Sequence, residues 1–189
     1  CTGGSVKWLC GGAGAGYLYV HPRWHTQLEP KMTGWMGHVA PFAFELPPIT
    51  YAPGITRFLH GSPNIPALYA ARPGYRVINE IGVASIRAKS VRQTQKLIGL
   101  CEEAGFKVTS PRDPERRGGT ITVAVEHAGA VTKELVRREI ICDYRPGAGV
   151  RLSPHFYTKD EELDYAVTEM RRIVETRAYT AHEAAGAAF

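Results

Sequence analysis

The sequence has few cysteines and no apolar stretch long enough to cross a bilayer. Four of its 189 residues are cysteine, far apart and without a Cys-x-x-Cys pair. A chain of this size does not depend on disulfides for its stability, so a reducing compartment fits this spacing best. No run of about 18 apolar residues and no signal-peptide pattern is present. These absences predict a soluble, cytoplasmic protein without a membrane partner.

A strong charge pattern is also lacking. The 23 Lys and Arg residues exceed the 18 Asp and Glu residues by a net +5, and they form no long basic run. This mild excess permits contact with anions but does not require a nucleic acid, so no nucleic-acid partner is expected. The seven histidines show no metal-ligand spacing, so no metal is expected. The hydrophobic content of 44% is enough for a real core.

What the sequence does contain is an unusual lysine. Lys7 lies between apolar neighbours and is bracketed by six glycines. The apolar blocks 4–8 and 17–20 predict two short buried strands joined by the glycine run, where other chains or ligands can approach the backbone closely. A lysine removed from water loses part of its preference for the charged form, and a neutral amine can form a Schiff base. On spacing alone, Lys7 could also simply reach solvent from a strand end.

The glycine run is not a phosphate-binding loop, because it has neither the Gly-x-x-x-x-Gly-Lys order nor a Gly-x-Gly-x-x-Gly that opens a helix. Residues 29–63 contain so many prolines and glycines that irregular chain over a surface is expected. Helical material follows at 67–71 and 75–81. Pro73-Gly74 interrupts it, which predicts a kink or two helices.

The second part of the chain alternates helices and strands. Helices are predicted at 83–104 and 129–138, and strands at 106–108, 120–125, 140–144 and 150–152. A capping box at Thr158–Glu161 precedes a last helix with an apolar stripe that ends near Val174. This order predicts a small α+β domain with helices on one face of a mostly antiparallel sheet. The weakly patterned tail, 178–189, is expected to be mobile or to contact a partner.

Three motifs carry a resemblance to a known family. They are Ser5–Gly16, then Gly34–His38, and then Asp143–Pro146 followed by Gly149–Tyr157. In this order and at about this spacing they resemble the segments around the pyridoxal phosphate (PLP) lysine and the substrate site of kynureninases, within the class V aminotransferase-like enzymes. The resemblance covers the chain up to about residue 177 and matches only the C-terminal half of such an enzyme.

The resemblance implies an α/β fold with a definite division. Residues 1–64 would be the C-terminal part of the PLP-binding large domain of a fold type I enzyme. Residues 65–82 would be a connecting helical segment, residues 83–177 the small C-terminal α+β domain, and residues 178–189 a tail.

The resemblance also implies roles for five residues. Lys7 would bind PLP as a Schiff base and shuttle the substrate α proton, and Arg151 would bind the α-carboxylate. Trp35 and Ser62 would reach the cofactor phosphate, Trp35 commonly across a dimer interface, while His38 would line the substrate pocket. Without the resemblance, each residue has an ordinary structural interpretation. Arg151 would form a surface ion pair, and Trp35 would be a core aromatic. Ser62 would be a turn hydroxyl, and His38 a structural histidine.

By analogy with the family, the substrate would be a small molecule of the amino-acid class. The reaction would be hydrolytic cleavage of the Cβ–Cγ bond of L-kynurenine to anthranilate and L-alanine, in NAD-linked tryptophan catabolism by a homodimer. The aspartate that pairs with the pyridine nitrogen and the main phosphate loop belong to the N-terminal half in this family. That half is therefore an expected partner, and a chain that opens at Cys1 is expected to be a fragment, a processed product or half of a split enzyme.

Departures from the family pattern leave alternatives open. Val6 stands where kynureninases typically have tyrosine, and Ala13 and Asn64 replace common prolines. The alternatives are a class V aminotransferase-like enzyme with another substrate, a desulfurase-like relative, a catalytically silent fragment or scaffold subunit, and, more weakly, a basic-patch binder. A desulfurase needs a thiol on a mobile loop, whereas Cys142 lies in an apolar strand pattern.

Overall fold

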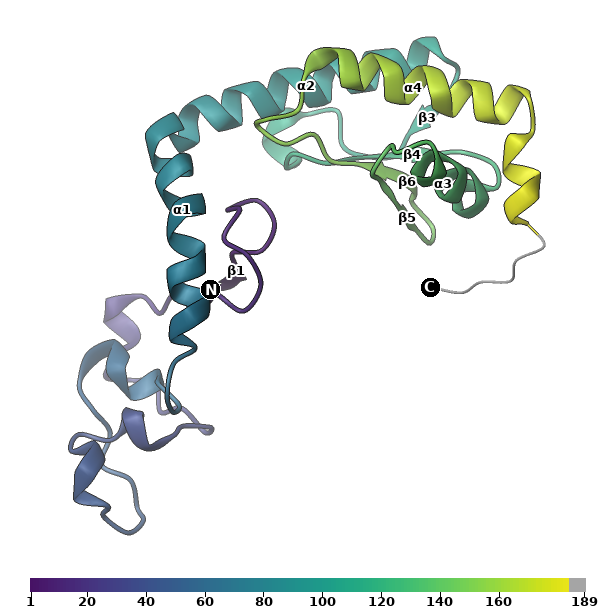
Figure 1. Ribbon diagram of the computed structural model, residues 1–189. Helices are drawn as coiled ribbons and strands as arrows, with labels where there is room; N and C mark the ends of the chain where they lie inside the picture. Colours follow the sequence, from purple (N-terminus) through teal and green to yellow (C-terminus); the bar gives the residue numbers. More distant parts are fainter. Residues whose placement is uncertain (184–189) are drawn as a thin grey trace. The chain divides into compact units, whose positions relative to one another are not determined.

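The computed structural model describes residues 1–183, and the chain divides into two compact units, Cys1–Glu80 and Ile81–Phe189 (Figure 1). The division falls close to the predicted start of the small domain at residue 83. None of the helices within the described residues is long and apolar enough to cross a membrane.

The first unit opens with an antiparallel hairpin of β1 (Thr2–Gly4) and β2 (Gly16–Leu18). Both strands are shorter and more exposed than the expected buried strands at 4–8 and 17–20, so that expectation is wrong. Two of the three residues of β1 are glycine, and Tyr17 and Leu18 of β2 are 49% and 45% exposed. Lys7 therefore lies in the loop between the strands.

Between the hairpin and the first α-helix the chain is irregular, as its prolines and glycines predicted. Its regular parts are short 3-10 turns: η1 (Pro22–Trp24), η2 (Trp35–Gly37), η3 (Pro41–Ala43) and η4 (Gly54–Phe58).

Helix α1 (Ile65–Ile81) runs without interruption through Pro73, so the prediction of two helices is wrong. Its buried residues, Ala67, Ala71, Gly74 and Ile78, recur every three or four positions and form one stripe. Pro73 itself is exposed. An interior proline costs about 3 kcal/mol, and packing along the buried stripe offsets this cost.

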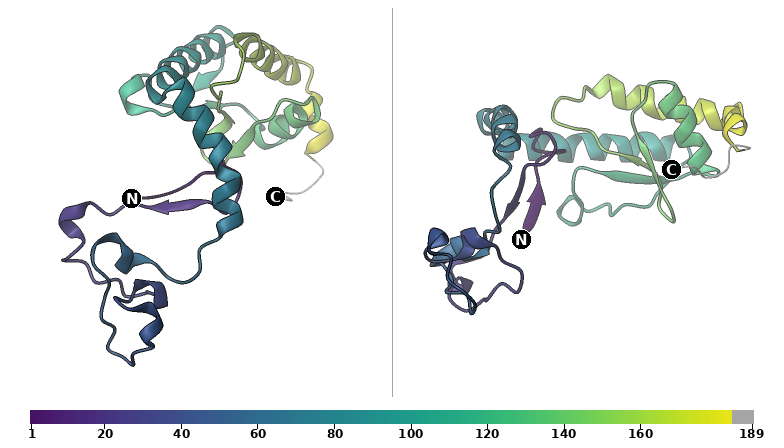
Figure 2. Two further views of the ribbon diagram at one scale, coloured as in Figure 1. Left: turned by 60° about the vertical axis from the view of Figure 1, so that its left-hand side comes forward. Right: turned by 60° about the horizontal axis from the view of Figure 1, so that its bottom comes forward.

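The second unit contains a four-stranded sheet in the order β3-β4-β6-β5, with every pair antiparallel. The strands are β3 (Lys107–Val108), β4 (Ile121–Ala124), β5 (Asp143–Arg145) and β6 (Gly149–Leu152). The helices are α2 (Val83–Glu103), α3 (Ala128–Arg137) and α4 (Asp160–Glu175). Residues of all three helices and of β3, β4 and β6 share one buried apolar core. Helices α2 and α4 lie side by side along the sheet (Figures 1 and 2), which confirms the expected α+β arrangement.

Two local expectations in this unit need correction. The strand expected at 140–144 begins only at Asp143. The cap of α4 lies one residue later than expected, because the Glu162 carboxylate accepts a hydrogen bond from the backbone N–H of Lys159 at 2.7 Å. The Thr158 hydroxyl instead accepts from the backbone N–H of His155 at 2.9 Å.

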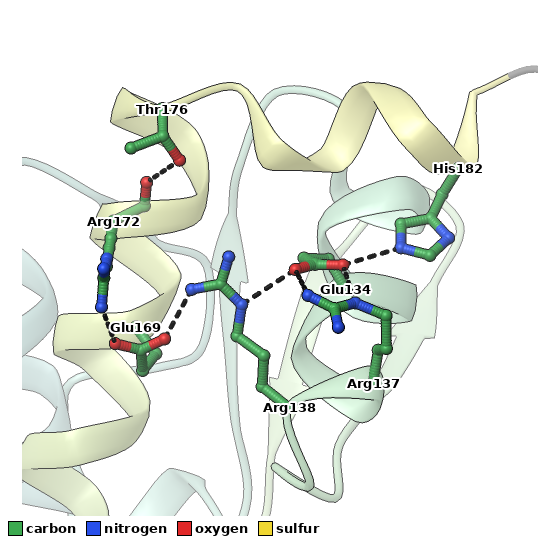
Figure 3. Close-up of polar contacts among 7 residues, drawn as sticks. All are labelled: Glu134, Arg137, Arg138, Glu169, Arg172, Thr176 and His182. Carbon is green, nitrogen blue, oxygen red and sulfur yellow. Dashed lines mark hydrogen bonds and ion pairs between the residues drawn. The ribbon is translucent and has the colours of Figure 1, made fainter.

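Part of the expected tail is ordered against the domain. A 3-10 turn, η6 (Ala178–His182), packs on α3 and α4. The ring of Tyr179 stacks on His127 with centroids 4.9 Å apart, and His182 Nε2 lies 2.9 Å from a carboxylate oxygen of Glu134 (Figure 3). The remainder of that tail, 184–189, lies outside the described residues.

Candidate functional site

The loop that carries Lys7 is closed by backbone hydrogen bonds. The N–H of Gly11 donates to the carbonyl of Ser5 at 2.7 Å, and the N–H of Cys10 donates to the carbonyl of Lys7 at 3.0 Å. Ser5 is fully buried, and both its N–H and its hydroxyl donate to the carbonyl of Ala15, at 2.9 and 2.8 Å. These bonds fix both ends of a tight loop. The Lys7 side chain at its tip is exposed in this chain, so the expected desolvation of the amine is not achieved by the described residues alone.

Helix α1 supports this loop through two glycines. A Cβ added at Gly74 would lie 2.3 Å from the carbonyl oxygen of Cys10, and one at Gly11 would lie 3.1 Å from the Cβ of Ala71. Contacts this short leave no room for a side chain, so the glycines permit the loop and the helix to touch. Pro73-Gly74 therefore marks the docking point of the lysine loop on the helix.

A hydroxyl pair joins the loop to the same helix. The hydroxyls of Ser5 and Tyr75 are within hydrogen-bonding distance. Because the Ser5 hydroxyl donates its single proton to Ala15, the Tyr75 hydroxyl must be the donor in this pair. The small apolar cluster of Ala15, Ala67 and Ala71 lies beside Tyr75. Tyr75 thus connects the loop of the candidate lysine to the helix core.

Trp35 and Ser62 come together through their backbone segments. The N–H of Met36 donates to the carbonyl of His60 at 3.1 Å, and a Cβ at Gly61 would lie 3.4 Å from the indole nitrogen of Trp35. Trp35 is 44% exposed, and Ser62, next to Gly61, is also exposed. An indole N–H donor and a hydroxyl are thus available on one side of the first unit.

His38 occupies a different setting, because it is buried. Its Nδ1 accepts a hydrogen bond from the N–H of Ala40 at 2.9 Å, and its Nε2 lies 3.2 Å from a carboxylate oxygen of Glu45. The bond to Nδ1 orients the ring within its own loop, whereas Nε2 makes no hydrogen bond to the described residues. The role of His38 in a substrate pocket stays a prediction.

Arg151 belongs to the second unit, on the face of the sheet opposite the helices. Along β6 the side chains of Val150 and Leu152 are buried in the core, whereas that of Arg151 is 32% exposed. Its cross-strand neighbours are Thr122 on β4 and Asp143 on β5. Arg151 Nε donates to Asp143 Oδ1 at 2.7 Å, and Arg151 Nη2 bonds Asp143 Oδ2. The arginine is therefore held by a bidentate ion pair.

A carboxylate with several hydrogen-bond donors around it supports the core of the second unit. Glu134 on α3 is buried and receives hydrogen bonds from Arg137, Arg138 and His182, and Arg138 bonds in turn to Glu169 on α4 (Figure 3). The bond from Arg137 above all, together with those from His182 and Arg138, holds the pKa of Glu134 well below its ordinary value. This network ties α3, α4 and η6 together.

The partly and fully buried thiols are poor nucleophiles. Burial raises the pKa of Cys142 to about 11 and that of Cys101 to about 12. Since the thiolate is the reactive form, both are protonated at neutral pH. Among residues 1–183, no group of three or more His, Cys, Asp or Glu side chains could hold a metal ion.

Comparison with known proteins shows which enzymes this chain resembles. Residues 86–170 match the family model of the kynureninase C-terminal domain. The chain resembles the C-terminal part of kynureninases. It is 33% identical to a kynureninase from Burkholderia mallei over 188 residues, covering 96% of this chain and 45% of that protein. A kynureninase from Geobacillus thermodenitrificans is 32% identical over 93% of this chain and 42% of its own length. The chain thus spans less than half the length of these kynureninases.

Solved structures show the same fold. The cystine C-S lyase C-DES, in a mutant with glycine linked to its PLP cofactor, superposes with a TM-score of 0.76 at 19% identity, covering 89% of this chain and 44% of that chain. The apo cysteine desulfurase from Thermococcus onnurineus superposes with a TM-score of 0.70 at 20% identity, covering 85% of this chain and 43% of that chain. The chain therefore shares the fold of the corresponding part of these two enzymes.

Sequence reasoning missed three residues of the site. Tyr75 and Gly74 escaped because only folding brings α1 against a loop some 70 positions earlier. Asp143 was part of a recognised motif, but its pairing with Arg151 depends on the register of β5 and β6. The only signal in the sequence was a carboxylate and an arginine on opposite arms of a glycine-rich hairpin.

Proposed function

We propose that this chain is the C-terminal part of a PLP-dependent hydrolase that cleaves L-kynurenine to anthranilate and L-alanine. The observation that carries the proposal is the position of Lys7, exposed at the tip of a loop that Ser5, Gly11 and α1 hold in place. An amine fixed on rigid backbone but open to a ligand suits covalent attachment of an aldehyde.

The residues present fit the cofactor. Lys7 supplies an exposed amine, and Trp35 and Ser62 supply exposed N–H and O–H donors suited to a phosphate. Large apolar side chains beside them are exposed, with Val6 at 53% and Trp8 at 43%. We infer that the N-terminal half of the enzyme covers this surface and removes Lys7 from water.

When bound, PLP supplies the electron sink for bond cleavage at the amino-acid substrate. This chain's own residues then position the substrate and move its proton. Lys7 Nζ acts as the base that takes the proton from the substrate α-carbon. Arg151 binds the substrate α-carboxylate through its planar guanidinium.

The test combines labelling with product analysis. The protein, with its N-terminal half, is incubated with PLP and reduced with borohydride, and the peptide that carries the adduct is identified by mass spectrometry. We expect the adduct on Lys7 and anthranilate release from L-kynurenine. Lys7→Ala should abolish both, while Lys31→Ala, which changes another exposed lysine of the same unit, should leave both intact. Labelling confined to other lysines contradicts the proposal.

The second candidate is a catalytically silent fragment or scaffold subunit. One observation favours it: Val6 stands next to Lys7 where the family typically has tyrosine. Labelling of Lys7 without anthranilate release would favour an enzyme with another amino-acid substrate, and transfer of the amino group to a 2-oxo acid would identify an aminotransferase. The raised pKa of Cys142 argues against a desulfurase, because that chemistry needs a thiolate.

We also propose that the enzyme works as a cytoplasmic homodimer in tryptophan catabolism, with Trp35 reaching the cofactor phosphate of the partner subunit. The exposure of Trp35 and of Phe42, whose rings lie 5.4 Å apart, supports a covering chain at this place. Sedimentation of the protein with its N-terminal half measures the oligomeric state, and a Trp35→Ala protein should lose PLP affinity. A monomer that binds PLP fully contradicts this arrangement.

A further inference from the structure

The guanidinium of Arg151 is engaged along one edge only. Arg151 Nε donates to one carboxylate oxygen of Asp143 at 2.7 Å, and Nη2 bonds the other oxygen. This side-on pair uses two of the five N–H groups of the guanidinium. Within residues 1–183, the other three, on Nη1 and Nη2, have no protein hydrogen-bond acceptor. Two of them, one on Nη1 and one on Nη2, form the end-on edge of the side chain.

The free edge lies on an uncovered part of the sheet. The helices pack on the opposite face, and Arg151 is 32% exposed beside Thr122 of β4. Hydroxyl groups lie near it: those of Thr109 and Thr122 lie 2.6 Å apart, and that of Ser110 lies 3.1 Å from Thr122. A polar surface that carries an oriented guanidinium suits a small anionic group better than an apolar one.

Asp143 is itself held from two sides. Besides Arg151, the guanidinium of Arg145 on the same strand donates to Asp143 Oδ2 at 3.0 Å. The cluster of one carboxylate and two guanidinium groups therefore keeps a net charge of +1. Asp143 can fix the direction of Arg151 without cancelling the attraction of the cluster for an anion.

We propose that Asp143 is a positioning residue that turns the end-on edge of Arg151 toward the α-carboxylate of the substrate and so selects substrates with a free α-carboxylate. This inference rests on the proposed function, because it takes the ligand to be an α-amino acid. Asp143 does not touch the substrate and acts only through Arg151. A guanidinium fixed on one side loses less rotamer freedom when the ligand binds, which favours binding.

A competing effect of Asp143 is repulsion of the incoming carboxylate. The two effects separate by ionic strength, because the Debye length shrinks from about 10 Å at 0.1 M to about 3 Å at 1 M salt. Screening at 1 M salt weakens the longer-range repulsion between Asp143 and the ligand more than the short bidentate contact between Asp143 and Arg151. Measurements at 1 M salt therefore report mainly the positioning effect.

The experiment compares Asp143→Asn with a matched control, Glu102→Gln. Glu102 also pairs with an arginine, Arg112, and is 50% exposed, against 41% for Asp143. Both substitutions convert an exposed carboxylate of the second unit into its amide. Equilibrium binding of L-kynurenine, and of its analogue lacking the carboxylate, is measured on the protein with its N-terminal half at 0.1 M and 1 M salt.

We expect Asp143→Asn to weaken binding of L-kynurenine roughly tenfold at 1 M salt. A change of this size corresponds to the loss of about one hydrogen bond between charged groups. Binding of the analogue and the thermal midpoint should stay within error of wild type, and Glu102→Gln should change neither ligand. NMR should show slow exchange of the Arg151 Nε proton with solvent in the wild-type chain and fast exchange in Asp143→Asn. A merely structural role would weaken both ligands equally.

The outcomes separate this inference from the proposed function. Equal or tighter binding of L-kynurenine to Asp143→Asn at 1 M salt overturns the role of Asp143, as does a wild-type protein that does not prefer L-kynurenine over the analogue. A wild-type protein that shows the carboxylate preference but releases no anthranilate overturns the proposed function and leaves the role of Asp143 standing.

Discussion

The hydroxyl of Tyr75 on helix α1 donates a hydrogen bond to the hydroxyl of Ser5, 70 positions earlier in the sequence. Ser5 is fully buried at the root of the loop that carries Lys7. The bond therefore couples the backbone of the candidate lysine to the most regular element of the first unit. A substitution on α1 should therefore change the amide hydrogen exchange of the loop.

Tyr75→Phe removes the donor and leaves one acceptor site of the Ser5 hydroxyl unpaired. We expect a loss of about 1 kcal/mol in the free energy of unfolding and faster amide hydrogen exchange in residues 6–12. Tyr69→Phe is the matched control, because Tyr69 lies on the same helix and is 65% exposed. Equal exchange rates in the Tyr75→Phe and wild-type loops would show that the hydroxyl pair does not brace the loop.

Gly74→Ala should move the lysine loop. The added Cβ would fall 2.3 Å from the Cys10 carbonyl oxygen, which is backbone and cannot turn aside. We expect destabilisation of the order of 2 kcal/mol, by overpacking, and weaker PLP labelling of Lys7.

The control for Gly74→Ala is Gly99→Ala. Gly99 lies within helix α2, and nothing would lie within 4 Å of its new Cβ. Because alanine has a higher helix propensity than glycine, Gly99→Ala should stabilise the chain by about 0.5–1 kcal/mol. Chemical denaturation gives both values, and a neutral Gly74→Ala would mean that the loop can withdraw from the helix without cost.

The pH dependence of stability should reflect Glu134. Its pKa in the folded chain is lowered well below the ordinary 4.5, chiefly by the hydrogen bond from Arg137. A depressed carboxylate pKa stabilises the fold fully above the unfolded value, and this stabilisation is lost as the pH falls below about 4.5 toward the folded pKa. The free energy of unfolding should therefore decline with acidification in that range.

Glu134→Gln tests this assignment. It should cost on the order of 2 kcal/mol at pH 7 and reduce the acid-induced decline, because a buried, multiply bonded carboxylate is lost. The exposed i,i+4 pair of Arg171 and Glu175 supplies the control, and Glu175→Gln should change stability by less than about 0.5 kcal/mol. An unchanged pH profile in Glu134→Gln would assign the acid sensitivity to other carboxylates.

Cysteine reactivity should divide into two classes. Cys1 and Cys10 are exposed, whereas burial raises the pKa of Cys142 to about 11 and that of Cys101 to about 12. At pH 8 only about one Cys142 thiol in a thousand is ionised, so alkylation of Cys142 and Cys101 should lag well behind that of Cys1 and Cys10. Mass spectrometry of a timed iodoacetamide reaction measures this, and denaturant should remove the difference. Rapid alkylation of Cys142 in the folded protein would again favour the desulfurase-like alternative.

The sequence by itself determined the second unit in most respects. Its signals are local: helix periodicity from Val83 to Glu103, a glycine stop at Gly105 with φ +82°, and alternation along Ile121–Ala124. The predicted helices and strands form there within a few residues. The motifs around Lys7 and Arg151 likewise carried the resemblance to kynureninases. Such features depend on neighbours in sequence, or on residue types at fixed spacing.

Only the tertiary structure decided how the candidate groups are held. Local propensity breaks a helix at Pro73, yet α1 continues, because its buried stripe packs against Ala15 and the lysine loop and Gly74 admits the Cys10 carbonyl. The Tyr75–Ser5 bond and the pairing of Asp143 with Arg151 arise only when a helix meets a loop and two strands take their register. These contacts join residues that are close in space but far apart in the sequence, so local sequence patterns do not predict them.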